Sequence, residues 1–316
     1  MDAFQRLGRS ISSRPMTADD QQTLAELQRR YGLLLPENYQ ERYEDLEPLP
    51  MGSAGVRYGA DGRIAWDQMW GSFCDLAIAG GPPHKGKLLE PANASEIAAD
   101  RNGYSAAVAE ICRGIAMVTD LSPEESSSAG WVRMECATTG MAAWMLRAIT
   151  VENVAVRADG AFLELPAGPA YRLHKEIRNV ITVIAKTVHY WVGHMSVLHR
   201  QTIVDLIAGM NDESPLIRPV YGIEDEGSRQ SLASAVAERI ERETGMTRSL
   251  HRHPDWIGVD CATPRAAVWM MRMLLAANVL ARREGNVLLV PIDTEADPDG
   301  EIVSSSVELV HRLPLG

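Results

Sequence analysis

Residues 131–166 and 256–291 are two copies of one stretch, and this duplication limits what the chain can fold into. The copies align without a gap at an offset of 125 residues, and 14 of the 36 aligned pairs are identical. Self-similarity of this kind indicates two copies of one structural unit. The shared residues include Trp131, Cys136, Trp144, Arg147, Asn153, Arg157, Gly160 and Pro166, which align with Trp256, Cys261, Trp269, Arg272, Asn278, Arg282, Gly285 and Pro291.

The pattern inside each copy predicts a strand, a helix and two further strands. In the first copy, residues 131–136 alternate as a strand, Thr138 can cap a helix, and an Asp-Gly turn separates the last two strands. Weaker matches extend the duplication towards the N-terminus: residues 88–91 match 216–219. We therefore predict an α+β fold of two tandem pseudo-symmetric repeats. Each is a helix–strand–helix followed by β-α-β-β, and the two pack about a pseudo-twofold axis that leaves a cleft between them.

This repeat divides the chain into four parts. Residues 1–65 form an N-terminal extension, in which Thr17 caps a helix and a β-hairpin follows. Residues 66–170 are the first repeat half, residues 171–195 a connecting helix, and residues 196–316 the second half.

Composition excludes several classes of protein. A formal net charge of −11 argues against a nucleic-acid or anionic-membrane binder, because phosphates and lipid headgroups select positive surfaces. No apolar run approaches the roughly 20 residues that a membrane-spanning helix needs, and the N-terminus lacks the apolar core of a signal peptide. The four cysteines have no metal-binding spacing. We expect a cytoplasmic protein without structural disulfides.

A loop in which the halves differ is the first candidate site. Residues 80–87 read GGPPHKGK, whereas the matching loop of the second half is acidic. Adjacent glycines allow close backbone approach, and His84, Lys85 and Lys87 supply positive charge for an anion. The alternative is an ordinary rigid turn with solvated lysines.

The connecting helix is the second candidate site. One face of residues 171–195 is apolar, whereas Lys175, Arg178, Lys186 and His189 follow the opposite face. Such a face attracts carboxylates or phosphates, and an arginine can bind them in a bidentate way. Alternatively, these cations pair with the protein's own acidic residues.

Proton transfer is the chemistry that these two segments suggest. His189, Tyr190 and His84 are candidate catalytic residues, because histidine titrates near neutral pH and tyrosine can donate a proton. His189 and His194 are five residues apart, too far around a regular helix to share a metal ion, unless the helix breaks at Gly193. We predict no metal site and assign no cofactor.

We therefore expect binding, and conversion, of a small anionic metabolite in a basic cleft between the halves. A carboxylate- or phosphate-bearing compound fits this expectation, and a tetrapyrrole precursor is one example. Two alternatives belong to other classes: a non-catalytic ligand or metal carrier, and a homodimeric interaction scaffold. The substrate and the reaction stay open.

Overall fold

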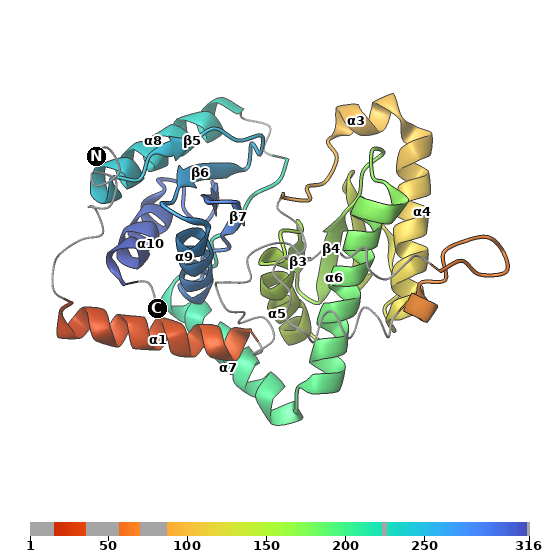
Figure 1. The fold of residues 1–316 in the computed structure, drawn as a ribbon, viewed down its shortest axis with the longest axis horizontal. Coiled ribbons are helices and arrows are strands. Elements are labelled where there is room, and N and C mark those ends of the chain that lie inside the picture. Colours follow the sequence, from red (N-terminus) through yellow and green to blue (C-terminus); the bar gives the residue numbers. More distant parts are fainter. Residues whose placement is uncertain (1–15, 36–56, 70–86, 223–225, 315–316) are drawn as a thin grey trace, which may run out of the picture.

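Two four-stranded antiparallel sheets form the framework of the protein in the computed structural model, which describes residues 16–35, 57–69, 87–222 and 226–314. The strand orders are β1-β2-β4-β3 and β5-β6-β8-β7, and the sheets lie in two separate units (Figure 1). The predicted α+β class is confirmed. The strands are β1 (Glu124–Glu125), β2 (Trp131–Glu135), β3 (Arg157–Asp159), β4 (Phe162–Pro166), β5 (Arg248–Ser249), β6 (Trp256–Asp260), β7 (Arg282–Glu284) and β8 (Val287–Pro291).

The strands of the two sheets pair in matching register. Trp131 faces Pro166 in the first sheet, and Trp256 faces Pro291 in the second. The turn from β3 to β4 contains Gly160 at φ +56°, and the turn from β7 to β8 contains Gly285 at φ +59°. Glycine suits both turns because it has no Cβ to clash in the left-handed region.

Two helices pack on each sheet, α4 and α5 on the first and α8 and α9 on the second, and a third helix packs against them. In the first unit α6 packs against α4 and α5, and in the second α10 packs against α8 and α9. Residues 171–195, predicted as a connecting helix, therefore contribute α6 to the first unit. Two π-helical segments, Leu173–Ile177 and Tyr190–His194, flank α6. The helices are α3 (Ala94–Ala99), α4 (Arg101–Val118), α5 (Thr139–Thr150), α6 (Arg178–His189), α7 (Val197–Glu213), α8 (Glu226–Thr244), α9 (Pro264–Ala276) and α10 (Glu301–Arg312).

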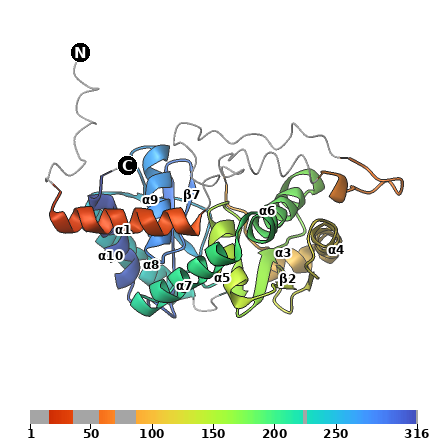
Figure 2. The same cartoon turned by 90° about the horizontal axis from the view of Figure 1, so that it is seen from below.

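The predicted N-terminal helix is α1 (Ala18–Leu34), which runs along the second unit and reaches the first unit at its C-terminal end (Figure 2). Thr17 caps it as expected, in a reciprocal capping box with Asp20. The helix packs on α9 of the second unit and on α5 of the first. At its C-terminal end, the indole N–H of Trp144 donates to the carbonyl oxygen of Leu34 at 2.7 Å. α1 therefore braces the two units against each other.

The predicted β-hairpin of the extension is short. Its strands meet in one antiparallel bridge between Tyr58 and Ile64, and a 3₁₀ helix, Asp67–Met69, follows. The first helix predicted for the first repeat half, from Trp66 to about Ala79, lies largely outside the described residues. Within the described part of the chain, no helix is long and apolar enough to cross a membrane.

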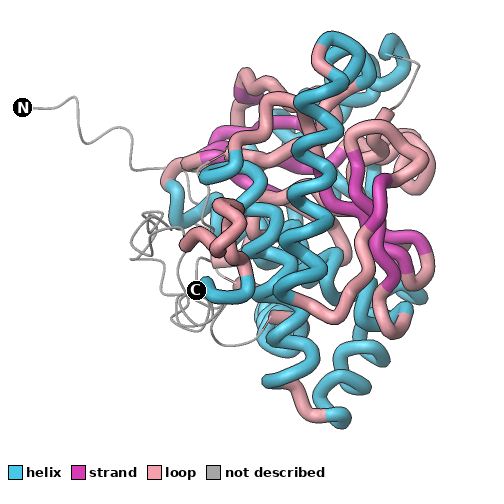
Figure 3. The backbone as a smooth tube through the Cα atoms, turned by 90° about the vertical axis from the view of Figure 1, so that its right-hand side faces the viewer, coloured by secondary structure: helices cyan, strands magenta, loops and turns pink. Residues whose placement is uncertain are grey.

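Each unit contains one parallel β-bridge, which lies just before the last two strands of its sheet. Leu89 pairs with Val154 in the first unit, and Ile217 pairs with Val279 in the second. In the first unit, β3 starts at Arg157, three residues after Val154. Figure 3 shows the strands in magenta, with helices in cyan and loops in pink around them, seen from the side of the first unit.

The residue before each of these valines is an asparagine with positive φ, +59° at Asn153 and +64° at Asn278. Asparagine is among the few residues other than glycine that tolerate this region. Both side chains reach across the junction: Asn153 donates to the carbonyl oxygen of Arg283 at 2.8 Å, and Asn278 accepts from the Arg147 guanidinium at 2.6 Å. These bonds join the two units through buried polar groups.

Candidate functional site

A cavity of about 540 Å³ lies at the junction of the two units. Both units line it, so their relative placement determines its shape. Its volume is within the range of pockets that hold small molecules. Lining residues include Glu90, Trp131 and Arg157 from the first unit, and Tyr221, Asp255 and Trp256 from the second.

The central carboxyl group of this cavity belongs to Glu90. This residue directly follows the bridge at Leu89, and the bridge directs it towards the second unit. There the Nη1 of Arg282, at the start of β7, lies 2.6 Å from Glu90 Oε1. The Arg282 side chain is only 1% exposed, whereas that of Glu90 keeps 21% of its surface accessible. Glu90 is thus held by a buried cation while still reaching the cavity.

The reason for this pairing across the junction is a difference between the two copies. In the first sheet, β3 residue Arg157 lies opposite Glu164 and forms an ion pair with it. In the second sheet, Arg282 lies opposite Leu289, which supplies no charge. Both guanidiniums still stack over the equivalent tryptophan, at 4.4 Å from the Trp131 ring and 4.7 Å from the Trp256 ring. Arg282 takes its acidic partner from the other unit.

Two carboxyl groups at this cavity have raised pKa values. Burial raises the pKa of Glu90 to about 7, and the nearby charge of Asp255 adds to the rise, although Arg282 opposes it. Burial also raises the pKa of Asp255, against the lowering effect of Arg229. A carboxyl group that titrates near neutral pH can both donate and accept a proton under physiological conditions. Perturbed carboxyl pairs of this kind are typical of functional sites.

Two neutral hydrogen-bond donors accompany Glu90. The Tyr221 hydroxyl and the Trp256 indole N–H both lower the pKa of Glu90. Neither atom reaches full hydrogen-bonding geometry with a protein partner. Buried donors in this condition are costly unless they find an acceptor. The Glu90 carboxyl group is the acceptor that both donors approach, and they favour its ionised form.

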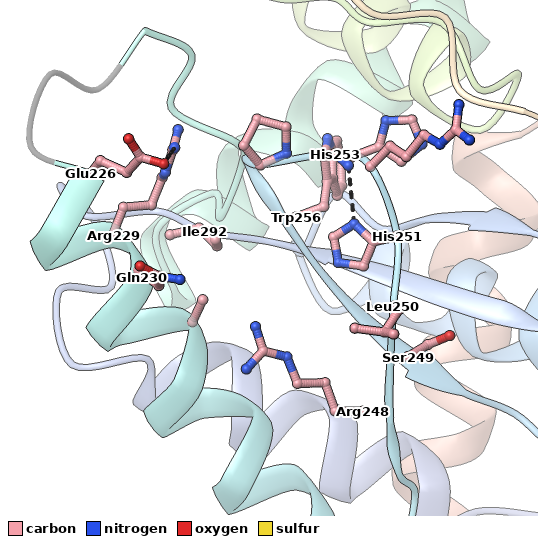
Figure 4. Close-up of a pocket in the computed structure, with 13 residues that line it drawn as sticks. Glu226, Arg229, Gln230, Arg248, Ser249, Leu250, His251, His253, Trp256 and Ile292 are labelled. Atoms are coloured by element: carbon pink, nitrogen blue, oxygen red, sulfur yellow. Dashed lines mark hydrogen bonds and ion pairs between the residues drawn. The ribbon is translucent and has the colours of Figure 1, made fainter.

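A second hollow of about 280 Å³ adjoins the cavity (Figure 4). Trp256, Arg252 and His253 line both. Arg229 comes from α8 and Arg248 from β5, and the two face this hollow from different sides (Figure 4). Arg229 also pairs with Asp255 at 3.1 Å. The hollow thus adds positive charge beside Asp255.

The two histidines of this hollow are held by the protein itself. The backbone N–H of Gly258 donates to His251 Nε2 at 2.9 Å, and His253 Nε2 lies 3.1 Å from Glu284 Oε1. Burial lowers the pKa of His251, which favours its neutral form. We interpret this pair as structural, because each imidazole already has a partner.

The predicted basic helix face is not an open cationic surface in the structure. Lys186 is buried and its Nζ lies 2.6 Å from Glu152 Oε1, with side chains 2% and 5% exposed respectively. Arg178 is buried as well, and burial lowers its pKa. Lys175 is exposed on the π-helical segment and lies 3.8 Å from Glu176. The alternative, pairing with the protein's own acids, therefore holds for Lys186.

The predicted loop site is only partly described. His84 and Lys85 lie outside the described residues, and Lys87 is exposed. Lys87 precedes Leu88, whose backbone N–H donates to Glu284 Oε1 at 2.8 Å. Neither Lys87 nor the helix lysines line the inter-unit cavity.

The predicted histidines do come together. His189 Nε2 and His194 Nε2 lie 2.9 Å apart, and the Tyr190 ring packs beside His194 with ring centroids 5.2 Å apart. Tyr190 is buried, so its ring packs against His194 and does not face solvent. Among the described residues, no group of three or more histidine, cysteine, aspartate or glutamate side chains is placed to hold a metal ion.

Sequence reasoning missed Glu90, Asp255 and Arg282. A signal for one of them is present, since the match of residues 88–91 with 216–219 aligns Glu90 with Arg218, a reversal of charge between the copies.

Comparison of the chain with protein families, with curated proteins and with solved structures found no match.

Proposed function

We propose that the protein binds a small organic anion in the inter-unit cavity and transfers a proton to or from it. The observation that carries this proposal is Glu90: a carboxyl group with a pKa of about 7, anchored by a buried arginine, at the wall of a cavity of about 540 Å³. The predicted class of ligand is kept, but its site moves from the basic helix face to the junction of the units.

Recognition of the anion is assigned to the arginines along the cavity and the adjoining hollow. Arg252 is exposed and lines both. Arg248 faces the hollow, and its Nη1 is 3.4 Å from the Ser234 hydroxyl. An arginine can bind a carboxylate or phosphate through two parallel hydrogen bonds. The anionic group would bind here, which places the rest of the ligand towards Glu90.

Proton transfer is assigned to Glu90, with Asp255 as a second carboxyl group. Near neutral pH, Glu90 is populated in both protonation states because its pKa is about 7. Protonated Glu90 can give its proton to a ligand atom, and Arg282 stabilises the carboxylate that results. In the reverse direction, the ionised carboxylate removes a proton. Tyr221 and Trp256 favour the ionised carboxylate of Glu90 as hydrogen-bond donors.

We also propose that the two repeats pack about a pseudo-twofold axis. It is supported by the equal strand orders, the matching registers and the equivalent bridges. We also propose a cytoplasmic location, which agrees with the free thiols of Cys112, Cys136 and Cys261.

A thermal-shift screen against carboxylate- and phosphate-bearing metabolites tests the proposal. A ligand at ~100 times its dissociation constant adds about 2.7 kcal/mol to the free energy of unfolding, which raises the melting temperature measurably. We expect at least one such ligand to stabilise the wild type, and the shift to shrink in Arg252→Gln. The matched control is Glu241→Gln on α8, an exposed acid that does not line the cavity.

Glu90→Gln separates binding from chemistry. If the ligand is still bound but its conversion stops, the acid–base role of Glu90 is supported. If Glu90→Gln converts the ligand as fast as the wild type, the role assigned to Glu90 is wrong. If no anion stabilises the wild type, or if Arg252→Gln and Glu241→Gln respond alike, the anion site is wrong.

A further inference from the structure

The end of α6 contains a pair of histidines arranged by an irregular helical turn. His189 closes α6, and His194 closes the π-helical segment Tyr190–His194. The backbone N–H of Met195 donates to the carbonyl oxygen of Tyr190 at 3.2 Å, a hydrogen bond that spans five residues. A π-helical turn brings residues five apart onto one side, as a regular α-helix does not. Because of this turn, the five-residue spacing of His189 and His194 does not prevent them from binding the same metal ion.

We propose that His189 and His194 together bind a divalent transition-metal ion, with the remaining coordination positions open to water or to a small ligand. The proposal is independent of the inter-unit cavity. Imidazole nitrogen is a preferred ligand of Cu²⁺, Ni²⁺ and Zn²⁺. The two Nε2 atoms are 2.9 Å apart, so both lie within reach of one ion.

The distance between the two nitrogens also points to a geometry. Metal–imidazole bonds of about 2.0–2.1 Å that meet at a right angle place the two nitrogens about 2.9 Å apart, whereas a tetrahedral angle requires about 3.3 Å. The observed 2.9 Å fits the right angle. Right angles are typical of the tetragonal sites of Cu²⁺ and Ni²⁺. The two nitrogens therefore need to move little to bind these ions.

The two imidazole rings already hold each other at these nitrogens. The Nε2–Nε2 contact is a hydrogen bond, which one neutral ring donates and the other accepts. The ring planes are inclined by 68°, with centroids 4.7 Å apart. A metal ion would take the place of the shared proton, which is released to solvent, and would bind the lone pairs of both nitrogens.

The surroundings fit a site that is open on one side. His194 is exposed, and the neighbouring Tyr190 ring limits its movement. His189 lines a hollow of about 400 Å³ together with Thr119 and Asp120 from the end of α4. This hollow has room for the water molecules or ligand atoms that would fill the other coordination positions.

Titration of the untagged full-length chain with CuCl₂ and NiCl₂ tests the proposal. We expect one ion to bind per chain, and a Cu²⁺ electron paramagnetic resonance spectrum with tetragonal parameters and coupling to two nitrogens. His189→Gln and His194→Gln should each weaken binding at least tenfold. Matched controls are His199→Gln, five residues beyond His194, and His253→Gln, which breaks up the other histidine pair.

Each result decides the question. Loss of binding in both site variants, with both controls intact, supports the pair as the metal site. Binding that survives in His189→Gln or in His194→Gln, or that is lost in a control instead, overturns it. A wild type that binds neither ion also overturns it. Circular dichroism melts of the variants show that lost binding does not come from unfolding.

Discussion

Arg282 Nη1 lies 2.6 Å from Glu90 Oε1 and thereby joins the two units at the cavity. The Nη2 of the same guanidinium donates to the carbonyl oxygen of Val154 at 2.8 Å, so Arg282 binds the first unit twice. One contact therefore has two consequences: it fixes the junction, and it positions the carboxyl group to which we assign proton transfer.

Removing the Glu90 carboxyl group should destabilise the fold. Glu90→Ala leaves the buried Arg282 without its acid, and breaking fully buried pairs costs roughly 3–5 kcal/mol. Since Glu90 is 21% exposed, we expect a smaller loss of about 2 kcal/mol. Glu90→Gln should lose less, because its amide oxygen still accepts a hydrogen bond from Nη1. Urea denaturation measures both, and equal losses in the two variants would contradict this account.

The raised pKa of Glu90 predicts a pH dependence of stability. The folded state holds this proton more tightly than the unfolded chain, whose carboxyl group titrates near 4.5. The resulting stabilisation is complete below pH 4.5 and is lost as the pH rises through about 7. The raised pKa of Asp255 acts in the same direction, whereas the lowered pKa of His251 acts oppositely. Glu90→Gln should flatten the fall in melting temperature over this window. A fall as steep as in the wild type would show that Glu90 does not titrate there.

The α+β class and the paired strands could be predicted because the sequence repeats them. The tryptophan, the cysteine and the glycine turn of each copy recur 125 residues apart, so each copy supports the interpretation of the other. The role of residues 178–189 was harder to predict. Their helical spacing is clear, but only packing on α4 and α5 shows that they belong to the first unit.

The candidate site could not be predicted in the same way. Glu90 and Asp255 are distant in sequence, and cross-unit contacts such as the ion pair between Arg282 and Glu90 bring their surroundings together. Such contacts leave no periodic pattern. For Lys186 the pattern was present but misleading. Its position on the basic helix face suggested ligand binding, whereas its side chain pairs with Glu152, in the turn after α5. A pattern along one helix cannot reveal a partner on another element.

The Lys186–Glu152 pair should contribute to stability and not to ligand binding. Both side chains are almost fully buried, so Glu152→Ala leaves an uncompensated charge, and we expect a loss of roughly 3–5 kcal/mol. The double change Lys186→Met/Glu152→Leu removes both charges and should recover most of that loss. Guanidinium denaturation compares the three proteins. A double variant as unstable as Glu152→Ala would mean that the charges themselves are not the cause.

The positive φ at Asn153 should make the Asn153→Ala variant less stable than the Asn153→Gly variant. With φ at +59°, alanine is strained, whereas glycine adopts this conformation freely. Both Asn153→Ala and Asn153→Gly lose the hydrogen bond to the Arg283 carbonyl oxygen, so this loss cancels in the comparison. We expect alanine to be less stable than glycine by about 1 kcal/mol, measured by urea denaturation. The reverse order would show that the unfolded chain, in which glycine is more flexible, outweighs the strain. Asn278, at φ +64°, offers the matched pair of variants in the second unit.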